Sequence, residues 1–332
     1  MRAWWVHRPG PVAGRPLVQG RRDASEPGRG EVRISVSCCG VCRTDLHLTE
    51  GDLAPRRPDI VPGHEVVGVV NALGPGVERL ALGERVGVAW LRGTCGACRF
   101  CRSGRENLCL YPLFTGWDVD GGYAEQAVVP EAYAYRLPEN YDDEHAAPLL
   151  CAGIIGYRAL QAARLPPGGA LGVYGFGASA HLTAQLALAG GATVHVLTRS
   201  LDAQRLALDL GAHSAGDADD PAPEPLDSAI LFAPVGALVP VALKALDRGG
   251  TLAVAGIHLS DVPTLNYQDH LFQERVLRSV TANTRRDGDE LMRLAARLPL
   301  RVATQPYPFD KADEALRDLA ADRVTGAAVI TL

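Results

Sequence analysis

The stretch Gly40-Val-Cys-Arg-Thr-Asp-Leu-His47, followed by Pro62-Gly-His-Glu65, decides how this 332-residue chain is organised. It places a thiolate at Cys42 and an imidazole at His64, a pair of donors that suits zinc better than calcium or magnesium. A third thiolate is available far along the chain at Cys151. A catalytic zinc needs three protein ligands and one exchangeable position, so these residues predict such a site.

The residues after Cys42 predict supporting roles. If Cys42 to His47 forms a helical turn, the three-residue spacing places Asp45 beside Cys42 and His47 beside Thr44. We therefore expect Asp45 to orient His64, because metal-bound imidazoles usually need such a partner. Thr44 and His47 are expected to form a hydroxyl-to-imidazole path for a proton. Each residue alone is more commonly structural, and only the joint pattern predicts the site.

Length and composition favour a two-domain α/β protein. The chain is long for one core, and 36 Gly and 23 Pro supply many turns. The net charge of −5 comes without a basic run, which excludes nucleic acid as an expected partner. The first residues lack the apolar core of a signal peptide, and no stretch approaches about eighteen uninterrupted apolar residues. We expect a cytoplasmic protein without a membrane contact, whose eight cysteines bind metal rather than form disulfides.

Alternating apolar residues predict that the first part of the chain is an antiparallel, barrel-like layer. The expected strands are Arg2 to Val6, Glu31 to Val36, Val66 to Val70 and Arg85 to Ala89. Two helices are expected between Asp142 and Ala163, the second of which leads out of this first domain.

A second cluster of thiols follows these strands. Cys95, Cys98, Cys101 and Cys109 lie within fifteen residues, and closely spaced pairs of this kind match the tetrahedral reach of a closed structural zinc site. An iron–sulfur cluster is the competing interpretation, because thiolate tetrads serve both metals. The spacing matches neither ferredoxin pattern, and no proline follows Cys109. We therefore assign zinc.

After residue 169 the pattern changes to alternating strands and helices. Ala170 to Tyr174 is a short apolar run, a glycine turn opens a helix that continues to about Gly190, and Thr193 to Leu197 is another strand. In this order the turn predicts a dinucleotide site, because its backbone can approach a pyrophosphate at the helix N-terminus. The turn residues expected to contact the cofactor are Gly175, Gly177, Ala178, Ser179 and Ala180. The alternation continues through Ser228 to Ala233, Leu238 to Leu246, Gly250 to Ala255 and Val276 to Ala282, which predicts a doubly wound parallel sheet.

The residues after the second strand of this sheet indicate whether the cofactor is NAD or NADP. An acidic residue there would bind the adenosine ribose of NAD, but the chain has Thr198-Arg199-Ser200 and no carboxylate before Asp202. A neutral Thr198 does not repel a 2′-phosphate, and Arg199 can pair with it. NADP is therefore favoured, and NAD stays possible if Arg199 is simply a solvent-facing loop residue.

Taken together, these motifs resemble the zinc-dependent alcohol dehydrogenases of the medium-chain dehydrogenase/reductase superfamily. The resemblance spans nearly the whole chain and also includes Gly-Glu-Arg-Val-Gly at 83 to 87 and Gly-Gly-Tyr-Ala-Glu at 121 to 125. It implies a GroES-like β-barrel catalytic domain (1–152 and 287–332) and a Rossmann domain with a doubly wound parallel sheet (153–286). It also implies a homodimer or homotetramer that acts on a small alcohol or aldehyde.

The resemblance further implies roles for individual residues. Cys42, His64 and Cys151 would ligate the catalytic zinc, with Glu65 close enough to exchange onto it, so that each chain carries two zinc ions with the four-cysteine site. Trp90 and Trp117 match positions that often line the substrate pocket. The chain departs from the family at Thr198, where an acidic residue is common, and at Ala327, where an arginine often reaches the cofactor pyrophosphate. Arg285 is the candidate to replace that arginine.

Two other functions remain open from the sequence. A related quinone or enoyl reductase would keep the glycine turn but should lack the predicted zinc ligands. A non-catalytic zinc protein would need neither the Thr44 and His47 path nor an intact cofactor turn. The adjacent Cys38 and Cys39 have no predicted role beyond packing.

Overall fold

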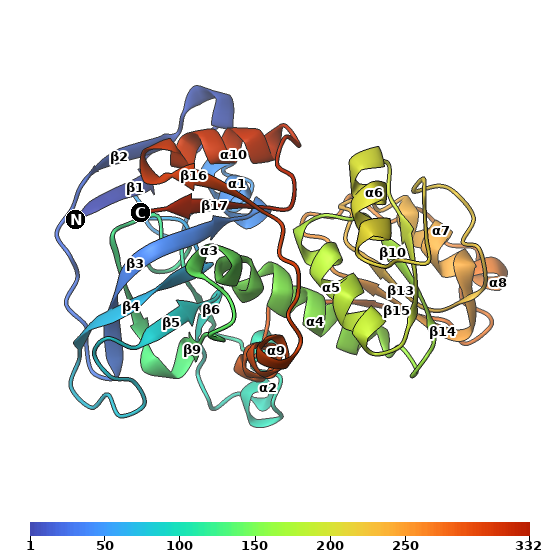
Figure 1. The fold of residues 1–332 in the computed structure, drawn as a ribbon, viewed down its shortest axis with the longest axis horizontal. Coiled ribbons are helices and arrows are strands. Elements are labelled where there is room, and N and C mark those ends of the chain that lie inside the picture. Colours follow the sequence, from blue (N-terminus) through green and yellow to red (C-terminus); the bar gives the residue numbers. More distant parts are fainter. The chain divides into compact units, whose positions relative to one another are not determined.

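The computed structural model describes residues 1–332, which divide into two compact units (Figure 1). The first unit is built from Met1–Cys151 and Ala282–Leu332, and the second from Ala152–Thr281. The chain therefore leaves the first unit once and returns to it once. Each unit has its own sheet and its own hydrophobic core.

The first unit contains a seven-stranded sheet in the order β16-β17-β3-β4-β5-β9, with β8 paired to β3. Its pairings are antiparallel apart from that of β16 with β17, which confirms the predicted antiparallel layer. The strands are β3 (Glu31–Val41), β4 (Val66–Leu73), β5 (Arg85–Val88), β8 (Gln126–Pro130), β9 (Ala134–Arg136), β16 (Thr304–Pro308) and β17 (Ala327–Thr331).

Strand β3 is longer than predicted and leads directly into the expected metal site. The alternating pattern ended at Val36, but the strand continues to Val41 because Cys38 and Cys39 pair with β17 on one side and with β4 on the other. Residues 38–41 are all buried, so their sequence has no alternation to reveal a strand. This pairing gives Cys38 and Cys39 a structural place inside the sheet.

Smaller elements complete the first unit. Two short ribbons pair β1 (Arg2–Val6) with β2 (Leu17–Arg21) and β6 (Leu91–Gly93) with β7 (Leu113–Phe114). The helices are α1 (Arg43–Glu50), α2 (Arg99–Arg102), α3 (Asp143–Ala146), α9 (Arg285–Arg297) and α10 (Ala312–Ala320). Figure 1 shows α10 alongside β16 and β17, where Ala312, Ala315 and Leu316 add to the core.

The second unit is a six-stranded parallel sheet in the order β12-β11-β10-β13-β14-β15, which confirms the predicted doubly wound sheet. Its strands are β10 (Ala170–Tyr174), β11 (Thr193–Leu197), β12 (Ser214–Gly216), β13 (Leu226–Leu231), β14 (Leu246–Val254) and β15 (Val276–Ser279). Its helices are α4 (Ala152–Ala163), α5 (Ala178–Ala189), α6 (Leu201–Asp209), α7 (Leu238–Ala245) and α8 (Tyr267–His270).

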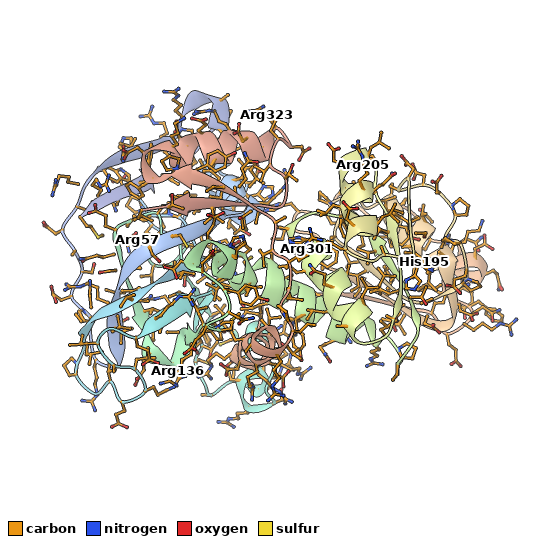
Figure 2. All side chains as sticks on the ribbon, viewed as in Figure 1. Arg57, Arg136, His195, Arg205, Arg301 and Arg323 are labelled. Atoms are coloured by element: carbon orange, nitrogen blue, oxygen red, sulfur yellow. The ribbon has the colours of Figure 1, made fainter.

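Two separate apolar clusters fill the faces of this parallel sheet. One joins alanines of α4 and α5 to valines of β10 and β11, and the other joins leucines of α7 to Tyr174 and Leu231. The buried His195 of this unit, labelled in Figure 2, is paired on both ring nitrogens, with Ser214 at 2.8 Å and Glu224 at 2.9 Å. The sheet is thus covered on both faces, as parallel sheets require.

No single helix of the chain is long and apolar enough to cross a membrane. The consecutive segments Asp143–Leu150 and Ala152–Ala163 pass that test only when taken together as a bent pair, by length and composition.

Candidate active site

The first part of the site is the junction between β3 and α1. Cys42 directly follows the strand and is the N-cap of the helix, where its Sγ accepts a hydrogen bond from the Thr44 amide at 3.3 Å. The Asp45 carboxylate returns a contact, accepting the Cys42 amide at 2.9 Å. This reciprocal capping box fixes the direction of the Cys42 thiol before any metal binds.

Asp45 also holds the second predicted ligand. Its Oδ1 atom lies 3.2 Å from Nδ1 of His64 and accepts the Gly63 amide at 3.0 Å. The Asp45 and His64 side chains are both buried, and each residue is 1% exposed. The opposite ring nitrogen, Nε2, lies 3.3 Å from Cys42 Sγ. Asp45 therefore orients both predicted ligands: it contacts the ring of His64 and accepts a hydrogen bond from the backbone amide of Cys42.

These residues form a four-donor cluster with Glu65 and Cys151. Ligand atoms of Cys42, His64, Glu65 and Cys151 all lie within 4.8 Å of one another. Around a tetrahedral zinc, a thiolate sulfur and an imidazole nitrogen should be separated by roughly 3.5 Å, given the usual bond lengths. The observed 3.3 Å between Cys42 Sγ and His64 Nε2 agrees with that separation, so geometry and donor chemistry both fit zinc.

The electrostatics of the cluster match its donor roles. A hydrogen bond with Cys151 holds the pKa of the Cys42 thiol well below its usual range, and the charge of His64 acts in the same direction. The same hydrogen bond, with burial, raises the pKa of Cys151. Burial lowers the pKa of His64, but the charges of Asp45 and Cys42 outweigh it and raise the pKa overall. Burial raises the pKa of Glu65. A cation bound among these buried donors would stabilise their deprotonated, charged forms.

The residues of the expected proton path lie on α1. Thr44 is buried beside Cys42, whereas Nδ1 of His47 lies 3.0 Å from the exposed carboxylate of Asp52. His47 is thus at the solvent side of the helix that begins at the metal site. Transfer of a proton between Thr44 and His47 stays a prediction.

The four-cysteine lobe is also assembled. The sulfur atoms of Cys95, Cys98, Cys101 and Cys109 lie within 4.8 Å of one another, and individual pairs are 3.5 to 4.0 Å apart. Tetrahedral zinc would separate two sulfurs by roughly 3.8 Å. Hydrogen bonds from the Cys101 and Leu110 amides lower the pKa of Cys98 to about 6, whereas desolvation raises the pKa of Cys101 to about 12. Geometry and donor set therefore fit a structural zinc.

The glycine turn of the second unit fits a dinucleotide. Gly175 has φ +82°, and a Cβ there would lie 2.8 Å from the Ala233 amide nitrogen. Gly177, the residue before α5, has nothing within 4 Å of an added Cβ. Since neither packing nor a left-handed conformation demands a glycine at position 177, the space beside it is consistent with close approach by a ligand. Ala178, Ser179 and Ala180 form the first turn of α5.

Thr198, Arg199 and Ser200 follow β11, as predicted. Thr198 is buried, Arg199 is exposed, and Ser200 is the N-cap of α6, where its Oγ accepts the Ala203 amide at 3.3 Å. The structure therefore gives Ser200 a capping contact, and the preference for NADP stays a prediction.

Comparison with known proteins decides the family. Residues 28–139 match the model "Alcohol dehydrogenase GroES-like domain", and residues 180–297 match "Zinc-binding dehydrogenase". A probable alcohol dehydrogenase AdhA of Mycobacterium tuberculosis is 58% identical over 100% of this chain and 97% of its own length. The chain belongs to the zinc-containing alcohol dehydrogenases.

Solved structures of alcohol dehydrogenases share the whole fold. A CAD of Helicobacter pylori, solved in complex with NADP(H), has a TM-score of 0.89 at 25% identity and covers 99% of this chain and 97% of its own. A thermostable alcohol dehydrogenase of Pyrobaculum aerophilum with bound cobalt and zinc has a TM-score of 0.90 at 26% identity and covers 100% and 99%. The chain is thus an alcohol dehydrogenase with two candidate zinc sites, and a nicotinamide cofactor is implied.

An aromatic stack in this alcohol dehydrogenase begins at the candidate zinc ligand His64. Trp90 packs edge-on against the His64 ring at 4.9 Å, and Trp117 stacks on Trp90 at 5.8 Å with Phe114 beside both. The Arg56 guanidinium covers Trp117 at 3.7 Å. The structure therefore brings the two predicted pocket tryptophans together next to the metal cluster. No motif in the sequence predicts that Phe114 and Arg56 join this stack.

Arg285 has contacts that the sequence did not predict. It lies in the first unit, where Glu106 of the four-cysteine lobe accepts from its guanidinium at 2.7 Å. Burial raises the pKa of Glu106, but hydrogen bonds from Arg285 outweigh this and hold that pKa below its usual range. Use of Arg285 by a cofactor phosphate stays a prediction, and it would require Glu106 to release the guanidinium.

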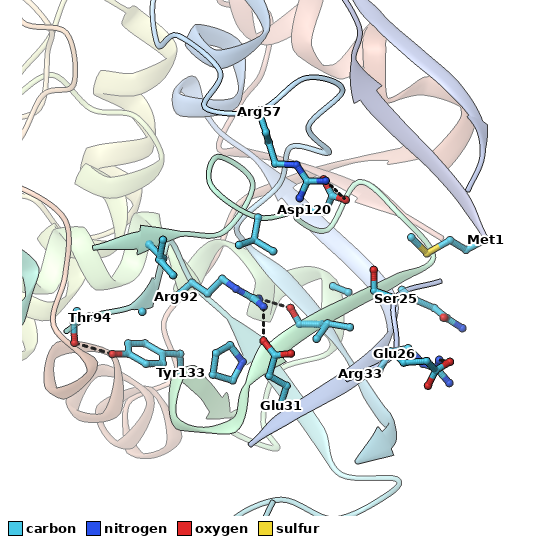
Figure 3. Close-up of a pocket in the computed structure, with 17 residues that line it drawn as sticks. Met1, Ser25, Glu26, Glu31, Arg33, Arg57, Arg92, Thr94, Asp120 and Tyr133 are labelled. Atoms are coloured by element: carbon cyan, nitrogen blue, oxygen red, sulfur yellow. Dashed lines mark hydrogen bonds and ion pairs between the residues drawn. The ribbon is translucent and has the colours of Figure 1, made fainter. Parts of the chain in front are cut away.

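A separate cavity of about 480 Å³ lies elsewhere in the first unit (Figure 3). Its charged side chains are paired with one another: Arg92 with Glu31 at 2.9 Å and Arg57 with Asp120 at 3.8 Å. No predicted zinc ligand, proton-path residue or cofactor residue lines it. The cavity is therefore distinct from the candidate active site.

Proposed function

We propose that this alcohol dehydrogenase interconverts primary or secondary alcohols with aldehydes or ketones by hydride transfer, and that it uses NADP(H) in preference to NAD(H). The observation that carries the proposal is the buried cluster of Cys42, His64, Glu65 and Cys151 with Asp45 behind it. This donor set combines three protein ligands with an exchangeable carboxylate, which distinguishes it from the closed four-thiol lobe.

Each residue of the cluster has a proposed role. Cys42, His64 and Cys151 would hold Zn²⁺, which when bound would supply Lewis-acid polarisation of the alcohol or carbonyl oxygen. Asp45 keeps the imidazole in the ligating tautomer by accepting its Nδ1 proton. Glu65 provides a fourth donor that can exchange with substrate.

Proton movement is assigned to α1. The Thr44 hydroxyl accepts the proton of the substrate hydroxyl as it gives up its own proton toward His47. The His47 imidazole passes a proton on to solvent, on the side where it contacts Asp52. A nicotinamide cofactor, when bound, would supply the hydride chemistry. Burial of Thr44 keeps water away from the step, while the 18% exposed side chain of His47 gives the proton an exit.

The cofactor preference rests on the end of β11. Thr198 brings no negative charge, and Arg199 is exposed and can pair with a 2′-phosphate. The fold-matched Helicobacter pylori enzyme was solved with NADP(H), which supports the preference without deciding it.

The substrate class and the assembly are also proposals. Stacked indoles next to His64 favour medium-sized or aromatic alcohols, since flat apolar rings pack well on such a wall. A homodimer or homotetramer is supported by β15, an edge strand whose four residues are all exposed and whose outer backbone groups invite pairing with a second copy.

Two variants test the proposal. Cys42→Ser should keep the fold and the four-cysteine zinc but lose turnover of benzyl alcohol by several orders of magnitude; unchanged turnover would remove Cys42 from catalysis. In the wild type, initial rates of benzaldehyde reduction should be higher with NADPH than with NADH. Thr198→Asp should reverse that ratio by charge repulsion, and a wild-type preference for NADH would refute the cofactor assignment.

A further inference from the structure

The four-cysteine lobe makes several hydrogen bonds to Arg285, which lies 179 residues after the lobe residue Glu106. Glu106 lies in the 3-10 turn Glu106–Leu108, between Cys101 and Cys109. Its two carboxylate oxygens accept the backbone amide of Arg285 at 2.7 Å and the guanidinium Nε and Nη2 at 2.7 to 3.2 Å. A bidentate pair that also includes a backbone amide fixes both the side chain and the main chain of its partner.

The other end of the lobe reaches the same place. Thr94, directly before Cys95, has its Oγ1 2.8 Å from the Tyr133 hydroxyl, as Figure 3 shows. The Arg285 guanidinium lies over the ring of Tyr133, 4.8 Å from its centre. Both ends of the lobe therefore converge on Arg285, one directly and one through Tyr133.

Arg285 belongs to the segment by which the chain re-enters the first unit, residues 282–288, here called the return segment. The segment opens with Ala282 in the left-handed region, at φ +49°, and Asn283 is buried with its Nδ2 3.4 Å from the Tyr135 hydroxyl. Thr284 then caps α9. At its end Gly288 lies so close to Tyr135 that a Cβ would be 2.3 Å from the ring.

These contacts describe a docked segment rather than a loose linker. A non-glycine residue with positive φ, such as Ala282, persists only where its surroundings impose that conformation. A glycine in contact with a ring, such as Gly288, lets the backbone lie closer to the ring than any other residue would allow. Since the second unit is joined to the first only before Ala152 and after Thr281, the return segment is one of its two covalent connections.

We propose that Glu106 is a positioning residue through which the four-cysteine lobe holds the return segment in place. The lobe then has a task beyond its own stability: it keeps one of the two connections to the cofactor-binding unit in a fixed conformation. The metal that fits the lobe would keep the turn around Glu106 folded, because Cys101 and Cys109 bracket that turn. The functional part of this inference rests on the proposed dehydrogenase function.

Hydrogen exchange of the return segment tests the proposal without reference to activity. Glu106→Gln keeps the shape of the side chain but removes the charge that binds Arg285, and we expect amide exchange in residues 282–288 to become at least tenfold faster. Glu125→Gln is the matched control, because Glu125 likewise accepts the backbone amide and Nε of an arginine, Arg2, at 2.7 Å. The control should leave exchange in 282–288 unchanged. Unchanged exchange in Glu106→Gln would overturn the proposal.

A second variant tests the link to the lobe. Cys98→Ser, which removes one ligand of the lobe, should also speed exchange in 282–288, and the double variant with Glu106→Gln should be no faster than the faster single variant. Multiplicative effects, or no effect of Cys98→Ser, would show that the lobe does not act through Glu106.

Steady-state kinetics separate positioning from general stability. In Glu106→Gln we expect the KM for the nicotinamide cofactor to rise at least threefold while the KM for benzyl alcohol and the zinc content stay unchanged. An unchanged cofactor KM would limit Glu106 to a local structural contact and so refute its positioning role. Absence of turnover in the wild type would refute the dehydrogenase function instead, and the exchange experiment would still decide whether the lobe holds the return segment.

Discussion

Replacement of Asp45 by Asn should weaken zinc binding at the active site while the fold survives. The carboxylate accepts three hydrogen bonds, from His64 Nδ1 and from the amides of Cys42 and Gly63, at 2.9 to 3.2 Å, and its side chain is about 2% exposed. Asn can place its oxygen toward His64 and Gly63, but its NH₂ group then faces the Cys42 amide, and two donors oppose each other. The uncharged oxygen also loses the charge-assisted part of its bond to the imidazole.

The magnitude follows from these two losses. Mutation of a residue that orients a metal-bound histidine typically costs about 10- to 100-fold in metal affinity, or roughly 1.4 to 2.7 kcal/mol. The opposed donors should lower the free energy of unfolding by a further amount on the order of 1 to 3 kcal/mol. Asp45→Asn should therefore bind one zinc normally, in the four-cysteine lobe, and the other about 10- to 100-fold more weakly.

Chelator competition at neutral pH, with zinc counted per chain, measures this directly. Asp287→Asn is the matched control, because Asp287 occupies the same capping-box position in α9 and is also buried. The control should lose unfolding free energy without a change in the affinity of either zinc. A zinc affinity in Asp45→Asn within twofold of wild type would mean that the Asp45 contact with His64 has no part in metal binding.

Two further predictions concern pH and substrate choice. Burial lowers the pKa of His181 to about 4. The unfolded chain binds a proton at this histidine below about pH 6.5, whereas the folded chain does not until about pH 4. The contribution of His181 to the free energy of unfolding should therefore be constant above pH 6.5 and fall by about 3 kcal/mol between pH 6.5 and 4. Urea unfolding of the wild type and of His181→Leu checks this, and curves that stay parallel with pH would contradict it. Trp117→Ala removes one ring from the stack beside Trp90 and should lower kcat/KM for benzyl alcohol about 3- to 10-fold relative to ethanol, given an aromatic pair energy of about 0.5 to 1.5 kcal/mol. An unchanged ratio of the two kcat/KM values would show that the stack does not meet the substrate.

The parallel sheet of the second unit was predictable because its signals are local. The apolar run Ala170–Tyr174, the glycine turn and the alanine-rich helix follow one another within twenty residues, and each appears in the structure at nearly its expected bounds. The sequence pattern predicts a helix over 289–298, whereas helix α9 spans Arg285–Arg297. The capping box of Thr284 and Asp287 is a sequence signal that would have placed its start correctly.

Other features had no local signal. Strand β2 (Leu17–Arg21) was not predicted because four of its five side chains are not buried and so show no apolar alternation. The extension of β3 to Val41 depends on pairing with β17, which lies almost 300 residues further along the chain. Pairings between distant strands are decided by the fold as a whole, so a short window of sequence does not contain them.

The two metal clusters differ in the same respect. All four thiols of the lobe come from residues 95 to 109, so their spacing alone predicted the cluster, and its geometry depends mainly on its own loop. The active-site cluster instead takes Cys42 from the end of β3, His64 and Glu65 from the start of β4, and Cys151 from the end of the first unit's N-terminal segment. Its donors meet only when the sheet is formed, which means that the sheet preorganises this site.

This difference has a consequence for how the molecule should respond to loss of each metal. Removal of the active-site zinc leaves a cluster that the β3 and β4 pairing and Asp45 still hold together, so the fold should persist. Removal of the lobe zinc leaves a short loop without a core of its own, in which Cys109 is the one buried ligand. Removal of the lobe zinc should therefore also loosen any element that the lobe holds in position. Glu106 makes the return segment such an element, so loss of the lobe zinc should be felt in the segment by which the chain re-enters the first unit.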